Sequence, residues 1–238
     1  MAQEKTERKG AENTQRASDL TTAERLIEFI QKNRKFIFGG FIVIIVVLVG
    51  SIVGLTVRDR MVTNAFMQLD GFTQRHQTLM PYAGVTQTFR QGEIDELLEE
   101  LAVFAARNSG SAAARAFIMS ADIYYAQGMW PEAEQAWSAA ANAARQPHLS
   151  PISLFNAAVA AEYDGDLDLA MALHTRVVQE HEQVFFLAIR SQFSLGRLYE
   201  AQGDTEAALG AWRGLVSRWP FDQFYANIAQ SRIIVLSD

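Results

Sequence analysis

The chain has 238 residues, of which 49% are hydrophobic and 20% charged, and it contains no cysteine. The missing cysteines exclude disulfides, thiolate zinc sites, iron–sulfur clusters and a cysteine nucleophile. The net charge of −6 is uneven, because residues 1–35 carry a net +2 and the remainder a net −8; an acidic domain argues against nucleic-acid binding, which requires clustered cations.

The N-terminal region divides into two segments before the first long apolar run. Residues 1–20 are polar with mixed charge, a composition that predicts a disordered tail. Thr21 and Glu24 have the spacing of a capping box. The apolar and basic residues that follow predict a short amphipathic helix over residues 21–35, lying on a membrane surface. A plain continuation into the next helix is the alternative.

Residues 36–57 form an apolar run without one charged side chain. A helix of this length spans about 33 Å, enough for the hydrocarbon core of about 30 Å. The run is longer than the roughly 7–15 apolar residues of a signal peptide, so we expect an uncleaved transmembrane anchor. Five basic side chains lie in the 20 residues before it and three in the 20 after it, a balance that favours a cytoplasmic N-terminus.

The segment 58–238 has the pattern of tetratricopeptide repeats. The best unit carries its signature residues at Leu195, Gly196, Tyr199, Gly203, Ala208, Trp212, Leu215 and Pro220. Gly196 and Ala208 are small where two helices cross, and Gly203 permits a turn at positive φ. Pro220 ends the second helix.

The same frame recurs upstream in three weaker units. The predicted turn glycines are Gly92, Gly128, Gly165 and Gly203, spaced 36, 37 and 38 residues apart. A last helix over 221–236 covers the apolar face of the final unit. The predicted fold is therefore all-α, with a single N-terminal transmembrane helix followed by an α-solenoid of tetratricopeptide-like helical hairpins.

Three segments resemble one particular family, the ancillary SecYEG translocon subunits (YfgM-like). They are the junction 29–35 (Phe-Ile-Gln-Lys-Asn-Arg-Lys), the unit 195–212 and the ending 229–236. The resemblance implies a single-pass protein of the bacterial inner membrane, with residues 58–238 in the periplasm. It also implies partners: translocon subunits, periplasmic chaperones or exported chains.

No pattern of catalytic or metal-binding residues stands out. His174 and His181 are seven residues apart, too far for two ligands of one ion, and His174 takes a packing position of its repeat. The acidic residues between Glu93 and Glu100 have the helical spacing of a solvated face. Phosphate-loop, nucleophile-elbow and zinc-protease motifs are missing from the sequence. We therefore expect no enzyme activity, no cofactor and no metal.

Candidate protein-binding residues follow from the repeat register, because the first helix of each unit lines the concave face of such a stack. They are Arg115, Met119, Asp122, Tyr125, Phe155, Asn156, Glu162, Tyr163, Arg190, Phe193, Arg197 and Glu200. Aromatic and charged residues together suit an adaptable peptide groove. The alternative is that these are ordinary solvated positions and that binding occurs at loops or through the anchor.

Two functions remain in competition. One is a chaperone-like, translocon-associated module that handles exported proteins at the inner membrane. The other is a structural adaptor in an envelope assembly, such as a periplasmic flagellar-motor collar. A promiscuous holder requires an apolar, adaptable groove, whereas an assembly part pairs through specific charges and large interfaces.

Overall fold

The computed structural model describes residues 22–80, 90–144, 146 and 148–237, and within these ranges it contains helices and no strand. The predicted all-α fold with tetratricopeptide-like repeats is confirmed. The tail predicted over 1–20 and the capping residue Thr21 lie outside the described residues. The chain divides into two compact units, Met1–Met61 and Val62–Asp238.

The first unit contains helix α2 (Thr22–Lys32) and the start of helix α3 (Arg34–Leu79). Asn33 alone separates them, and its side-chain amide donates a 3.0 Å hydrogen bond to the carbonyl of Phe29. The helix predicted over 21–35 thus ends at Lys32 in the structure, and Arg34 and Lys35 belong to α3.

Helix α3 holds the apolar run. Across the described part of the chain it is the one helix long and apolar enough to cross a membrane, judged by length and composition, with a mean hydropathy of 3.0 in its apolar window. The helix does not end with the apolar run at Val57. The structure instead continues one helix to Leu79, because no proline or glycine lies between Val57 and Met61.

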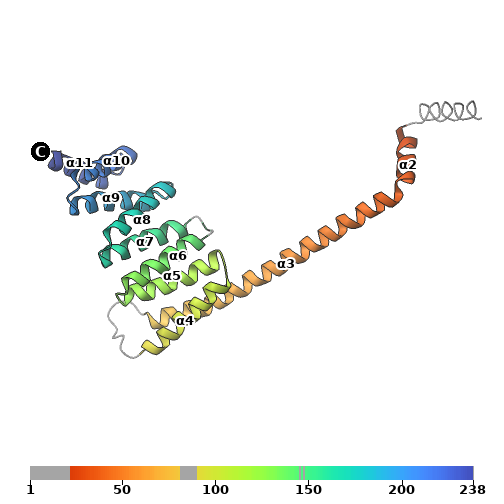
Figure 1. Cartoon of the computed structure of the whole chain (residues 1–238), viewed down its shortest axis with the longest axis horizontal. Helices are drawn as coiled ribbons and strands as arrows, with labels where there is room; N and C mark the ends of the chain where they lie inside the picture. Colours follow the sequence, from red (N-terminus) through yellow and green to blue (C-terminus); the bar gives the residue numbers. More distant parts are fainter. Residues whose placement is uncertain (1–21, 81–89, 145, 147, 238) are drawn as a thin grey trace, which may run out of the picture. The chain divides into compact units, whose positions relative to one another are not determined.

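The second unit is a solenoid of short helices that follow one another in chain order (Figure 1). Three hairpins, α5/α6, α7/α8 and α9/α10, lie between α4 on one side and α11 on the other. The bounds are α4 Gln91–Arg107, α5 Ser111–Ala126, α6 Trp130–Ala143, α7 Leu149–Asp164, α8 Leu167–Glu180, α9 Phe185–Ala201, α10 Thr205–Arg218 and α11 Gln223–Ser237.

The turns within the hairpins depend on glycine. Gly128, Gly165 and Gly203 have φ values of +72°, +85° and +78°, a left-handed region in which a Cβ is unfavourable. In the two later hairpins an aspartate follows the glycine and caps the next helix. Asp166 accepts from the backbone N–H of Leu169 at 3.0 Å, and Asp204 repeats this contact in the next hairpin.

Gly92, predicted as a further turn glycine, is not one. It is the second residue of α4 and lies in helical backbone. The left-handed glycine of this region is Gly110, with φ +65° immediately before α5. The prediction was wrong because a spacing of 36–38 residues was extended into a degenerate unit, in which Gly92 falls inside a helix.

Small residues set the distance between paired helices. Ala208 in α10 is fully buried, and Gly196 in α9 lies directly against the indole ring of Trp212. A Cβ added at Gly196 would lie 2.6 Å from two ring atoms of Trp212, closer than real contacts permit. Trp212 is itself only 2% exposed, so it has no space into which to move. The predicted close crossing at Gly196 and Ala208 is confirmed.

We predict that Gly196→Ala destabilises the protein by about 1–2 kcal/mol, because overpacking outweighs the gain in helix propensity. The measurement is thermal unfolding of the full chain in detergent, followed by helical circular dichroism. Gly210→Ala is the matched control: Gly210 is in α10, and an added Cβ there meets nothing within 4 Å. The control should be neutral or stabilising, and equal destabilisation by both changes would contradict the close crossing.

Candidate functional site

A groove of about 600 Å³ opens on the face formed by alternate helices of the solenoid, α7, α9 and α11. These are the first helices of successive repeats, which such a stack places on one side. The volume lies within the usual range of about 300–1,000 Å³ for ligand sites. Its lining residues are Phe155, Val159, Glu162, Tyr163, Arg190, Phe193, Ser194, Arg197, Phe224, Tyr225 and Ile228.

Half of the candidate binding residues lie together in this groove. They are Phe155, Glu162, Tyr163, Arg190, Phe193 and Arg197. The repeat register had not included the α11 residues Phe224, Tyr225 and Ile228, because α11 was expected only to cover the last unit. The aromatic pair at the start of α11 was the available signal, since α11 occupies the place of a further first helix.

The first repeat presents a different surface. Arg115 places its guanidinium 5.8 Å from the ring of Phe66 in α3. Met119 is buried, and its sulfur lies 3.8 Å from the Thr73 hydroxyl of α3. The C-terminal part of α3 thus covers the face of α5 that the sequence placed on the open concave side. Arg115 and Met119 do not line the groove.

Tyr125 belongs to an aromatic cluster that continues the groove toward α5 and α6. Its ring centroid lies 5.0 Å from that of Trp130 and 5.8 Å from that of Tyr163. Trp130 and Tyr163 stack with centroids 4.9 Å apart. Tyr163, which is 59% exposed, lines the groove as well, so aromatic surface extends beyond it. Asn156, by contrast, is half-buried and does not line the groove.

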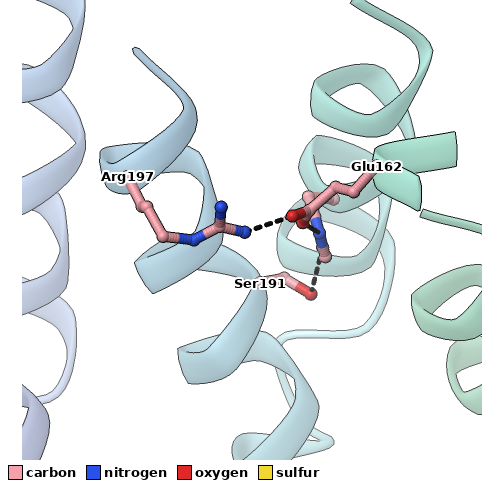
Figure 2. Close-up of polar contacts among 4 residues, drawn as sticks. Glu162, Ser191 and Arg197 are labelled. Carbon is pink, nitrogen blue, oxygen red and sulfur yellow. Dashed lines mark hydrogen bonds and ion pairs between the residues drawn. The ribbon is translucent and has the colours of Figure 1, made fainter. Parts of the chain in front are cut away.

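Glu162 is the centre of a network that joins three helices. His174 of α8 donates through Nε2 to Glu162 Oε1 at 3.0 Å, since an ionised carboxylate can only accept. Arg197 of α9 pairs with the other oxygen, reaching across from its neighbouring helix (Figure 2). Ser191 Oγ lies 3.2 Å from His174 Nδ1. We call these four residues the Glu162 network.

Glu200 repeats the arrangement one hairpin later. The indole Nε1 of Trp212 donates to Glu200 Oε1 at 2.6 Å, and Arg232 of α11 pairs with both carboxylate oxygens, with Nε at 3.0 Å from Oε1. In both networks the aromatic donor lies 12 residues after the glutamate, and an arginine from the next first helix completes the set. Glu200, Trp212 and Arg232 form the Glu200 network.

The first hairpin, α5/α6, does not contain such a glutamate-centred network. Tyr125 is the residue 12 positions before Trp137, and a phenol takes the place of the carboxylate. The buried indole N–H of Trp137 has no hydrogen-bond partner among the residues that the structure describes. The network therefore distinguishes the two later hairpins from the first.

Both carboxylates stay ionised in these surroundings. Burial alone would raise the pKa of Glu162, but the hydrogen bonds from His174 and Arg197 outweigh it and lower that pKa. The hydrogen bond from Arg232 is the main reason that the pKa of Glu200 is lowered. Since the carboxylates of Glu162 and Glu200 and the guanidinium of Arg197 are paired within the stack, these residues are less available to a partner than the register implied.

The Glu162 network has the side-chain types of a hydrolytic triad, a serine, a histidine and a carboxylate. However, Ser191 and His174 are both fully buried, and neither lines the groove. A substrate in the groove would not reach the Ser191 hydroxyl, so the arrangement joins helices. Within the described ranges no group of three or more acidic or histidine side chains could hold a metal ion.

Comparison with known proteins supports the repeat assignment. Residues 190–221 match the tetratricopeptide repeat family. The chain is 35% identical over 128 residues to a TPR repeat-containing protein of Treponema pallidum (strain Nichols), a match that covers 54% of this chain and 52% of that protein. The chain thus spans about half the length of this relative. No solved structure matches this chain. Tetratricopeptide repeats are typical of protein-interaction modules and scaffolds without catalysis.

Asp122, on α5, has neither a hydrogen bond nor an ion pair to another described residue. Burial raises its pKa to about 6 from an ordinary value of 3.8. The folded state therefore binds this proton more tightly than the unfolded state does. The resulting penalty is absent below about pH 4, grows as the pH rises, and is complete above about pH 6.

We predict that Asp122→Asn stabilises the protein by about 1–2 kcal/mol at pH 8, because it removes a half-buried charge without a partner. At pH 4 the same change should have almost no effect, since the aspartate is then mostly neutral. Urea unfolding at the two pH values measures the difference. Equal effects at both pH values would show that Asp122 is solvated.

Proposed function

We propose that the chain is a membrane-anchored protein-binding module that holds polypeptide segments in the groove between α7, α9 and α11. The observation that carries this is the aromatic lining, to which Phe155, Phe193, Phe224 and Tyr225 contribute from three helices. Aromatic side chains provide large contact areas at low conformational cost and are the usual binding hot spots. Protein binding is also the typical activity of tetratricopeptide repeats.

The apolar part of α3 would serve as the anchor in this proposal. Its large side chains between Phe36 and Val57 are mostly exposed, as lipid contact requires. The excess of basic residues before it favours a cytoplasmic N-terminus and a periplasmic repeat domain at the bacterial inner membrane. With the resemblance described above, this supports an ancillary role at the SecYEG translocon, handling exported chains or passing them to periplasmic chaperones.

The groove favours a transient holder over a structural adaptor such as a flagellar-motor collar. A stable assembly part buries about 1,200–2,000 Å² or more in a specific interface. The groove instead offers a hollow that accepts only a few residues, with exposed aromatic surface beside it at Tyr163. Such a site suits many different segments held one at a time.

We predict that a photo-reactive amino acid in place of Ser194, which lines the groove, crosslinks to exported chains or translocon subunits in intact cells. Mass spectrometry of the adducts identifies the partners. The same probe in place of Gln179, an exposed residue of α8 outside the groove, is the control and should give far fewer adducts. Equal labelling from both positions would contradict the groove as binding surface, and adducts confined to motor-ring proteins would favour the adaptor.

A further inference from the structure

The charged side chains of the groove differ in whether they are already neutralised. Glu162 and Arg197 pair with each other across α7 and α9. Arg190, on α9 as well, has no carboxylate within ion-pair distance in the described part of the chain. The groove therefore presents one uncompensated charge, and this charge is positive although the chain is acidic overall.

Arg190 is held in place by aromatic rings. Its guanidinium carbon lies 4.6 Å from the ring centroid of Phe155 in α7 and 5.2 Å from that of Phe186 in α9. Cation–π contacts of this kind orient the guanidinium but leave its charge and its five N–H donors unneutralised. A side chain that is already ordered loses less entropy when a carboxylate binds it.

The apolar lining lies on both sides of the helix that carries Arg190. Phe155 and Val159 come from α7, and Phe224, Tyr225 and Ile228 come from α11. A peptide that crosses from α7 to α11 thus passes apolar side chains of both helices, with Arg190 on the helix between them. An internal acidic residue with large apolar neighbours on both sides matches this order, whereas a chain end supplies such neighbours on one side only.

We propose that the groove selects polypeptide segments in which an aspartate or glutamate stands between aromatic or large aliphatic residues, and that Arg190 binds the carboxylate. This inference rests on the proposed function, which requires only that the groove binds polypeptides. It adds the chemical class of the segment and the residue that recognises it. Charge-assisted, bidentate contacts between arginine and carboxylate provide the specificity.

The test uses fluorescently labelled octapeptides and the full chain in detergent micelles, with fluorescence anisotropy as the readout. The acidic peptide is Gly-Ser-Phe-Glu-Leu-Phe-Ser-Gly with a C-terminal amide, and its partner has glutamine in place of the glutamate. We expect the wild type to bind the acidic peptide about 10-fold more tightly. Arg190→Gln should reduce this preference to less than twofold, while Arg190→Lys should retain part of it.

Arg176→Gln is the control, because Arg176 lies on α8 outside the groove and pairs with Glu180 four residues later. It should keep the full preference, and unchanged helical circular dichroism should show that each variant is folded.

Equal affinity for both peptides, or a preference that survives in Arg190→Gln, would overturn this inference while leaving the proposed function intact. No binding of either peptide would overturn the proposed function as well. Tighter binding of Gly-Ser-Phe-Gln-Leu-Phe with a free C-terminus would assign the site to chain ends instead.

Discussion

A hairpin of two short helices cannot bury an apolar face alone, so each repeat of this solenoid is stable only against its neighbours. In the two later hairpins a glutamate near the end of the first helix makes that contact specific. It accepts a hydrogen bond from an aromatic N–H of its own hairpin, His174 or Trp212. It also pairs with an arginine of the next first helix, Arg197 or Arg232. One carboxylate therefore fixes both the pairing within a hairpin and its stacking on the next.

This use of charge determines what the concave face can offer a partner. Glu162, Arg197 and Glu200 stand at positions that a repeat register assigns to binding, yet their side chains are already paired within the stack. What remains open is an aromatic hollow and the guanidinium of Arg190. Different side chains thus serve binding at the groove and stability of the solenoid, although they are neighbours on the same helices. A change at Arg197 would alter both properties, whereas a change at Arg190 separates them.

The sequence predicted those features that depend on one residue type at one place. Glycines at 128, 165 and 203 are needed for left-handed turns, and the close helix crossing at Gly196 and Ala208 follows from the repeat signature. Contacts between helices that are distant in the sequence could not be predicted from single residue types. Nothing local shows that the C-terminal part of α3 covers Met119, because this contact joins residues 46 positions apart.

Half of the candidate residues lie in the groove for a related reason. Position in a repeat determines the face on which a side chain lies, and Phe155, Phe193 and Arg190 all line the groove. It does not determine whether a charged side chain has an internal partner. The signal for Glu162 and Glu200 was present as a glutamate 12 residues before an aromatic N–H donor. Single positions read one at a time could not reveal that pairing, since it involves two or three helices.

The most direct test of the account is a double-mutant cycle between Glu200 and Arg232, measured by urea unfolding of the full chain in detergent. The variants are Glu200→Gln, Arg232→Gln and the two combined; each change removes a charge, and the cycle subtracts the effect of the shorter side chain at position 232. If the carboxylate links successive repeats, the two changes are coupled, with an interaction free energy of about 1 kcal/mol. Free energies that add to within about 0.3 kcal/mol would show that the pair contributes nothing to stacking and would contradict the account.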